Sequence, residues 1–221
     1  MIPDAPAPPP HKELDDLLSH LPCSQILECR EGQVIYSQNE PSSNLYLVIQ
    51  GKVTVSCLAY DRRQVIIDIY GQDEFFGESA MLRLVQHSEQ ATAHKHTKLM
   101  SWTPSEIEGL TLKHPRLSIA LLQMLVQRTY DLTQRIESFS TDNIPRRLAR
   151  TLIRLSDRLG KAEEDGSRQM MPLTHDFLAQ YMGTSRELVT VYMNQLRRLG
   201  YLQYSRKGIV VYRNGLSEWL R

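Results

Sequence analysis

The stretch from residue 173 to residue 196 constrains the fold of this chain most, because its pattern predicts two short helices joined by a tight turn. Gly183 stands between two apolar repeats, where glycine accepts the backbone conformation that ends a helix. Ala179 is small enough for a second helix to cross the first closely. The side chains expected on the inner faces of the two helices are Phe177, Leu178, Met182, Val189, Met193 and Leu196.

The second of these helices has a polar first turn. Thr184 or Ser185 is expected to cap it, and Glu187 follows Thr184 at the spacing of a capping box. Its outer face begins with Ser185, Arg186, Glu187 and Thr190, whose side chains suit base edges and phosphates in the major groove. The alternative is an ordinary helical hairpin with a solvated face. The agreement of cap, small residue, turn glycine and polar first turn favours a DNA-binding helix-turn-helix.

Charge is distributed unevenly along the chain, although the formal net charge is only +1. Residues 1–139 carry 12 Lys and Arg against 17 Asp and Glu, whereas residues 140–221 carry 14 against 8. The N-terminal part is therefore acidic and the C-terminal third basic. This distribution is typical of a protein that presents one end to nucleic acid.

Length and composition predict a cytoplasmic protein of two modest domains. The 221 residues are enough for two cores. The sequence contains no apolar run of the roughly 18 residues that span a bilayer, and no signal-peptide core, so no membrane attachment is expected. Five prolines among the first ten residues predict a disordered tail over residues 1–12.

Residues 13–104 are expected to form a β-rich sensor domain, after a short helix near residues 13–19. Short β-branched or aromatic runs alternate with turn glycines at intervals of roughly ten residues, a pattern that favours a jelly roll or small barrel. Pro104 is expected to end this region. The predicted strands are Val34–Tyr36, Asn44–Ile49, Lys52–Val55, Val65–Ile69 and Lys98–Trp102.

Residues 105–140 contain a predicted long helix, from near Leu117 to about Phe139. Apolar side chains recur there in alternating steps of three and four, the spacing of a coiled-coil seam. Leu121 and Met124 broaden this stripe toward the β-rich domain. The seam favours a parallel homodimer, and the alternative is a helix that stays within its own subunit. The seam residues are Leu122, Leu125, Thr129, Leu132, Ile136 and Phe139.

Residues 141–221 are expected to form a winged helix-turn-helix domain. A capped helix begins near Pro145, continues with leucines at helical spacing and stops at Gly160. The polar stretch 161–167 is predicted to be a loop. Two strands, 201–204 and 209–212, flank a turn in which Arg206 and Lys207 are placed for phosphate contact.

A β-rich sensor, a long dimer helix and a C-terminal winged helix-turn-helix, in this order, resemble the cyclic-AMP receptor protein and fumarate-nitrate regulator (CRP/FNR) superfamily. The resemblance covers residues 15–215, and its strongest motifs are Ser185-Arg186-Glu187 and the segment Phe75–Ala80. It implies an α+β fold and a homodimeric transcription regulator. Such a regulator binds a palindromic promoter site under the control of an effector, and it has RNA polymerase as a partner.

Within this resemblance, Arg186 and Glu187 would read bases, because arginine bonds guanine and glutamate accepts from cytosine. Ser185 and Thr190 would contact phosphate or a thymine methyl group, and Thr184 belongs to the same surface. Many relatives carry another arginine one turn later, where this chain has Val191 or Tyr192. A different operator sequence is therefore expected at one or two positions.

The expected effector pocket departs from the cyclic-AMP pattern of the superfamily. In cyclic-nucleotide binders, a Gly-Glu pair opens a short helix that holds the phosphate, and an Arg-Ser pair completes the site. The Arg-Ser pair aligns with Glu89-Gln90, and a carboxylate there would repel a cyclic phosphate. The alternative is that Glu89 is a salt-bridged surface residue on a hairpin. The pocket residues so implied are Gly77, Glu78, Ser79, Ala80, Glu89 and Gln90.

Cysteine and histidine do not make a convincing metal centre, and the cofactor is left unknown. Cys23, Cys29 and Cys57 cannot alone supply the four ligands of an iron–sulfur cluster, so structural cysteines in a reducing cytoplasm are favoured.

His94 and His96 are expected to share one face of a strand, with His87 nearby. Solvated surface histidines are favoured over a haem or metal site. A further hypothesis gives Arg83, His87 and Lys95 to an anionic ligand.

Two other classes of function compete with that of a DNA-binding regulator. A metabolite-sensing regulatory subunit of an enzyme has no need for a winged helix-turn-helix. An enzyme is disfavoured because the sequence contains no phosphate-binding loop, nucleophile elbow or zinc-protease motif. Within the regulator class, control by cyclic AMP, a cyclic dinucleotide, haem or redox state stays open, as does activation against repression.

Overall fold

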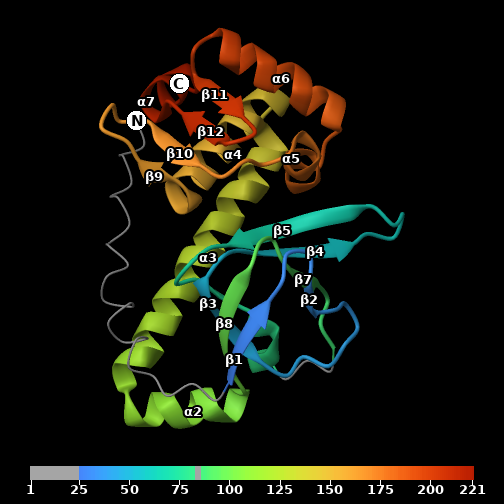
Figure 1. The fold of residues 1–221 in the computed structure, drawn as a ribbon, viewed down its shortest axis with the longest axis vertical. Helices are drawn as coiled ribbons and strands as arrows, with labels where there is room; N and C mark the ends of the chain where they lie inside the picture. The colour runs from blue at the N-terminus through green and yellow to red at the C-terminus, as the bar shows by residue number, and fades with distance from the viewer. Residues whose placement is uncertain (1–24, 83–85) are drawn as a thin grey trace.

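The structure is a computed structural model that describes residues 25–82 and 86–221. Figure 1 shows a β-rich half, a long helix rising along it, and a mostly helical half at the other end. The predicted tail, the predicted helix near residues 13–19, Cys23 and Arg83 lie outside the described residues. Within the described part, no helix is both long and apolar enough to cross a membrane.

The β-rich half is a jelly roll of two antiparallel four-stranded sheets, which confirms the predicted fold class. One sheet has the order β1-β8-β3-β6 and the other β2-β7-β4-β5. Alternate side chains of both sheets fill the space between them, and Val48, Val53 and Phe76 are fully buried there. The strands are β1 (Gln25–Cys29), β2 (Val34–Tyr36), β3 (Leu45–Gln50), β4 (Val53–Leu58), β5 (Gln64–Tyr70), β6 (Phe75–Phe76), β7 (Gln90–Ala93) and β8 (Thr97–Trp102).

The segment between the two halves contains two helices rather than one. Pro104, expected only to end the β region, is the first residue of α2 (Pro104–Lys113), because Thr103 and Glu106 form a capping box around it. The helix α3 (Pro115–Thr141) follows after His114 and extends beyond the predicted bounds at both ends. Proline is well placed in a first helical turn, where its missing N–H costs no hydrogen bond.

The helix α3 divides its apolar side chains between two directions. Leu117 and Ala120 are buried, and Leu121 and Met124 pack against the cluster that joins α2 to the jelly roll. The predicted seam residues lie on a different face and are exposed. One face of α3 therefore packs against its own subunit. A second face carries an apolar stripe that is exposed.

The C-terminal half combines helices with a small sheet. Asn143 caps α4 (Ile144–Leu159), and buried leucines at helical spacing anchor it, as predicted. The stretch 161–167 is not simply a loop, because its ends form β9 (Lys161–Ala162) and β10 (Arg168–Met170). These strands extend the predicted wing to a four-stranded sheet of order β11-β12-β10-β9. The remaining elements are α5 (His175–Met182), α6 (Arg186–Arg198), β11 (Leu202–Ser205), β12 (Gly208–Val211) and α7 (Arg213–Trp219), the last of which the sequence pattern did not predict.

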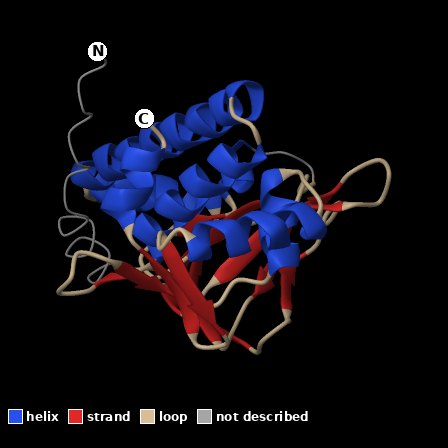
Figure 2. Ribbon diagram, turned by 90° about the horizontal axis from the view of Figure 1, so that it is seen from above, coloured by secondary structure: helices blue, strands red, loops and turns tan. Residues whose placement is uncertain are grey.

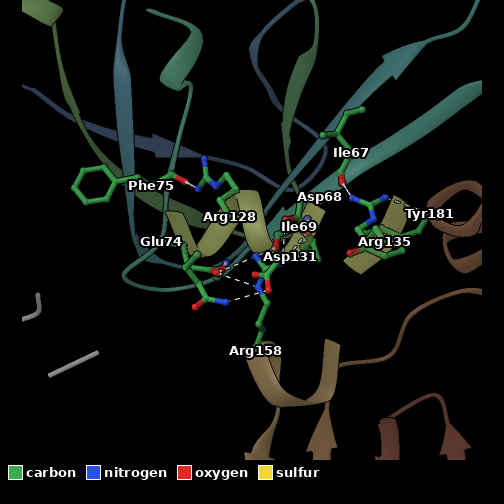
Figure 3. A network of polar contacts seen from close by, with 12 residues as sticks. Ile67, Asp68, Ile69, Glu74, Phe75, Arg128, Asp131, Arg135, Arg158 and Tyr181 are labelled. Carbon is green, nitrogen blue, oxygen red and sulfur yellow. Dashed lines mark hydrogen bonds and ion pairs between the residues drawn. The ribbon is translucent and has the colours of Figure 1, made fainter. Parts of the chain in front are cut away.

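The two halves are docked onto one another. Helices lie along one side of the sheets in Figure 2, and Ile66 and Ile69 of β5 belong to the same buried cluster as the helix-turn-helix core. Arg158 of α4 bonds both carboxylate oxygens of Asp68 at 2.9 Å and Glu74 at 2.9 Å (Figure 3). Apolar burial and this half-buried ionic cluster together fix the mostly helical half against the β-rich half.

Candidate DNA-binding surface and sensor pocket

The turn between α5 and α6 has the geometry of a helix-turn-helix. Gly183 ends α5 in the left-handed conformation, with φ of 64°, which glycine adopts without a side-chain penalty. Ser185 caps α6, and its hydroxyl accepts the amide of Leu188 at 3.3 Å. The predicted capping box between Thr184 and Glu187 is therefore wrong, since the cap lies one residue later. The hydrogen bond of Glu187 to its own amide, and then that to the Ser185 hydroxyl, lower the pKa of this glutamate.

The outer side of α6 is exposed over its first turn. Ser185, Arg186 and Glu187 are exposed, whereas Val189 and Met193 on the inner side are fully buried. In Figure 1, α6 lies at the end of the molecule farthest from the jelly roll. No described element covers this polar turn, so a groove of DNA can reach it.

Thr190 is less free than its neighbours, because His175 of α5 holds it. The Thr190 hydroxyl donates to the carbonyl of Arg186 at 2.8 Å and lies 2.8 Å from Nδ1 of His175. The hydroxyl has one proton, so Nδ1 of His175 must be the donor in this contact. Burial, and then the charge of Arg186, lower the pKa of His175, which stays neutral near pH 7. The sequence pattern missed this residue, since no helical spacing relates it to Thr190.

The wing is a two-residue turn that is tied to α6. Arg206 and Lys207 form the exposed tip between β11 and β12. The Tyr204 hydroxyl of β11 donates to the side-chain oxygen of Asn194 in α6 at 3.0 Å. The guanidinium of Arg197 lies 5.1 Å from the centre of the Tyr204 ring. The wing tip is thereby held at a fixed place relative to the recognition helix.

The region predicted to form the effector pocket contains a glutamate that is paired with an arginine from α3. Arg128 forms an ion pair with Glu78 and a hydrogen bond with the carbonyl of Phe75. Its guanidinium lies 4.8 Å from the centre of the Tyr70 ring. Arg128 was not predicted, although it interrupts the stripe that carries Leu121 and Met124 toward the β-rich domain. The sequence signal that could have identified Arg128 is a charged residue on the side of a predicted helix that faces the protein interior.

Glu89 lies in this pocket rather than on the surface, so the salt-bridged surface alternative is wrong. Its carboxylate accepts a hydrogen bond from the Tyr36 hydroxyl at 3.3 Å. Burial, and then the nearby charge of Glu78, raise the pKa of Glu89. Gln90 does not join them, because its amide donates to Thr92 along its own strand at 3.3 Å.

The remaining residues predicted for the pocket make hydrogen bonds within the protein. The predicted Gly-Glu pair opens a 3-10 helix (Glu78–Leu82), in which the amide of Ala80 donates to the carbonyl of Gly77. Ser79 lies 3.1 Å from Ser42 and 3.1 Å from Nδ1 of His87. The Ala80 amide is therefore engaged within the turn and is not directed at a ligand.

The three histidines differ in exposure: His96 is exposed as predicted, whereas His87 is buried and His94 is half-buried. His87 is 1% exposed and stacks on Tyr36 with 3.8 Å between ring centres, because the chain folds it under the β2 strand. Burial lowers the pKa of His87, which favours its neutral form. His94 and His96 lie in the bend between β7 and β8 rather than on one strand, and Lys95 between them is exposed. Among the described residues, no group of three His, Cys, Asp or Glu could hold a metal ion.

The two described cysteines differ in burial. Cys29 is buried in the jelly-roll core, and Cys57 is half-buried in β4. Both are free thiols.

The seam of α3 is an uncovered apolar stripe. Leu122, Leu125, Leu132, Ile136 and Phe139 are between 41% and 66% exposed. Thr129 lies between them and is exposed as well. Burial of such a stripe against a second copy would remove five large apolar side chains from water.

Comparison with known proteins assigns a domain family to each half of the chain. Residues 26–114 match the cyclic nucleotide-binding domain family, and residues 146–219 match the Crp-like helix-turn-helix domain family. A CRP-like cAMP-activated global transcriptional regulator of Mycobacterium tuberculosis is 25% identical over 187 residues, which cover 85% of this chain and 84% of the relative.

Solved structures share the whole arrangement. FixK2 of Bradyrhizobium japonicum superposes with a TM-score of 0.77 and 22% identity, covering 90% of this chain and 97% of its own. The c-di-GMP responsive global regulator CLP of Xanthomonas campestris gives a TM-score of 0.73 at 22% identity, covering 92% and 99%. The chain belongs to the CRP/FNR superfamily of transcription regulators.

Proposed function

We propose that this regulator acts as a cytoplasmic homodimer that places one α6 helix in each half of a palindromic promoter site. The exposed polar turn of α6, at the end of the molecule, is the observation that carries this proposal. Arg186 and Glu187 read base edges, while Ser185, Thr190 and the neighbouring Thr184 contact the backbone or a thymine methyl group. Arg206 and Lys207 of the wing contact phosphates.

The proposal divides the chain into functional regions. Residues 13–104 sense, residues 105–140 dimerise, and residues 141–221 bind DNA and present a surface to RNA polymerase. Protection of two half-sites about one helical turn apart in a footprint is expected. Protection of a single half-site would contradict the dimeric arrangement. A regulator of transcription is favoured over an enzyme, because the two halves match the cyclic nucleotide-binding domain family and the Crp-like helix-turn-helix domain family.

The effector is proposed not to be ordinary cyclic AMP. Glu89 takes the position of the arginine that binds phosphate in the family, and Glu78 raises the negative charge further. Arg128 is already engaged by Glu78 and the carbonyl of Phe75. A cyclic phosphate in this region would lie near the carboxylates of Glu78 and Glu89 and near a single cation, Arg128, that is already paired.

Relatives do not fix the effector. One relative is named for activation by cAMP and one structural neighbour for its response to c-di-GMP, at 25% and 22% identity respectively. The same fold therefore carries different ligands, and the pocket chemistry decides. The polar residues of the pocket already form hydrogen bonds and ion pairs within the protein. DNA binding that needs no ligand, and that is set by the amount of the regulator in the cell, is compatible with this arrangement.

Cyclic AMP is expected to bind weakly to the wild type and to leave its affinity for DNA unchanged. The double variant Glu89→Arg with Gln90→Ser is expected to gain at least about tenfold in cyclic AMP affinity, because a repulsive charge becomes attractive. Titration calorimetry measures both. Micromolar binding by the wild type, abolished in Glu78→Ala and coupled to a large gain in operator affinity, would overturn this account of the pocket.

Glu89 is also expected to make stability depend on pH. Its pKa in the folded state is raised above the ordinary value of 4.5, so its contribution is fully favourable below that pH and is lost as the pH rises through the folded-state pKa. Glu89→Gln should therefore be more stable than the wild type at pH 8 and equal to it near pH 4. Urea unfolding across this range measures the difference.

The matched control is Glu28→Gln, since Glu28 has the opposite shift. The hydrogen bond and charge of Lys98 lower the pKa of Glu28, so its loss should not stabilise the protein at pH 8. If Glu89→Gln is no more stable than the wild type at pH 8, the charge of Glu89 is not unfavourable in the fold.

A further inference from the structure

The second turn of α6 exposes an apolar side chain beside the polar first turn. Its four residues are Thr190, Val191, Tyr192 and Met193. Met193 is fully buried, and the ring of Tyr192 packs against the helix-turn-helix core. Thr190 is half-buried, whereas Val191 is 58% exposed. Valine is therefore the residue that this turn offers to anything that approaches the outer side of α6.

The hydroxyl of Thr190 has no donor left for a base. Its single proton is donated to the carbonyl of Arg186 at 2.8 Å, and its oxygen lies 2.8 Å from Nδ1 of His175. These contacts hold the side chain of Thr190 to its own helix and to α5. Polar recognition by the second turn is therefore restricted, although Thr190 stands next to Val191 in the chain.

Asn194, in the following turn, is also engaged within the protein. Its side-chain oxygen accepts hydrogen bonds from the Tyr204 hydroxyl of the wing and from the guanidinium of Arg197, both at 3.0 Å. The residues before and after Val191 thus use polar atoms to fix α6 against α5 and the wing. The surface between them is left to the valine side chain.

Val191 lies on the same side of α6 as the polar first turn. It follows Glu187 by four residues, so the two side chains are neighbours on the helix surface. This side faces outward at the end of the molecule (Figure 1). Valine also favours helices less than alanine, lysine or glutamate, so it gives an exposed helical position no intrinsic advantage. A groove that receives Glu187 would bring a base edge against Val191.

We propose that Val191 is a specificity-determining residue that contacts the C5-methyl group of a thymine in the major groove. This inference rests on the proposed function of α6 and names the kind of base pair that its second turn reads. Valine cannot bond the acceptors of guanine, and the thymine methyl is the apolar group that base edges present in this groove. Each half-site therefore contains an A·T pair at the position that Val191 reaches.

Replacement of thymine by deoxyuridine removes only the C5-methyl group and tests this contact directly. The probe is a duplex that the wild type selects from random DNA, in which each thymine is replaced in turn in both half-sites. At one position the wild type should lose about 15-fold in affinity, because each half-site loses the burial of one methyl group, worth about fourfold. The loss should vanish in Val191→Ala. Fluorescence anisotropy measures both affinities.

Leu199→Ala is the matched control. Leu199 is 51% exposed and caps the C-terminal end of α6, so this variant removes a similar apolar side chain away from the first turn. It should keep the deoxyuridine effect of the wild type. An equal effect in Val191→Ala and the wild type, or no effect at any thymine, would overturn the contact.

Val191→Arg tests the same position by a change of preference. Arginine bonds O6 and N7 of guanine, so selection from random DNA should return G·C in place of A·T at the deoxyuridine-sensitive position, with the same half-site spacing. An unchanged A·T pair at that position would contradict the role of Val191.

Arg186→Ala in the same assay separates this inference from the proposed function. If Arg186→Ala binds the selected duplex as tightly as the wild type, α6 is not the helix that reads DNA, and both fail. If Arg186→Ala loses affinity while Val191→Ala keeps the full deoxyuridine effect, only the valine contact fails. Since Val191 is exposed, Val191→Ala should unfold at the temperature of the wild type, which a thermal melt checks.

Discussion

Glutamate at Leu125 and Leu132 together is expected to convert the protein to monomers and to abolish tight operator binding. Both side chains are exposed on the seam of α3, and a two-fold contact would bring the new charges together. Loss of the second recognition helix should lower the affinity for a full site by about 10²–10⁴-fold, because the two half-sites are no longer bound by one linked molecule. Light scattering measures the mass, and fluorescence anisotropy measures the affinity.

The matched control is the double variant Gln123→Glu with Tyr130→Glu. These residues have the same spacing of seven on α3 and are exposed, but they lie beside the seam. The control should remain a dimer. A stable dimer of the Leu125 and Leu132 variant would show that the seam has been assigned to the wrong face.

Arg186→Ala is expected to lose about 1–3 kcal/mol of operator affinity and to relax discrimination at one base pair per half-site. Arg186 is exposed in the first turn of α6, and its side chain makes no hydrogen bond or ion pair with another residue in the described part of the chain, so its loss should leave stability unchanged. Anisotropy with the selected operator and with single-base variants of it measures both effects.

Lys207→Ala provides the contrast for this prediction. Lys207 is exposed at the wing tip, where a phosphate contact carries no sequence information. Its loss should weaken binding to all sequences alike and reduce the slope of affinity against salt by about one. Equal loss of discrimination in both variants would remove the distinction between base and phosphate contacts.

The elements whose apolar residues recur at a regular spacing were predictable from the sequence. Val189, Met193 and Leu196 recur at helical spacing and are buried, and the leucines of α4 behave likewise. Such patterns report which face of an element meets the core, and this depends on local periodicity. The positions of five jelly-roll strands, the apolar stripe of α3 and the helix-turn-helix followed from the same kind of signal.

The parts that depend on contacts between distant segments were not predictable. Arg128 meets Glu78 across 50 positions, and Tyr36 meets Glu89 across 53. The strands β9 and β10 are too short to show a period of two, and His87 is buried by a loop crossing that no local pattern encodes. The pocket chemistry therefore became visible only when the chain was folded.

Selection of binding sites from random duplex DNA, with the wild type and Arg186→Ala side by side, tests the central claim most directly. The wild type should enrich an inverted repeat whose half-sites are about one helical turn apart, without added cyclic AMP. Arg186→Ala should return the same spacing with one position per half-site degenerate. The same motif and the same affinity for both proteins would contradict the assignment of α6 as the helix that reads DNA.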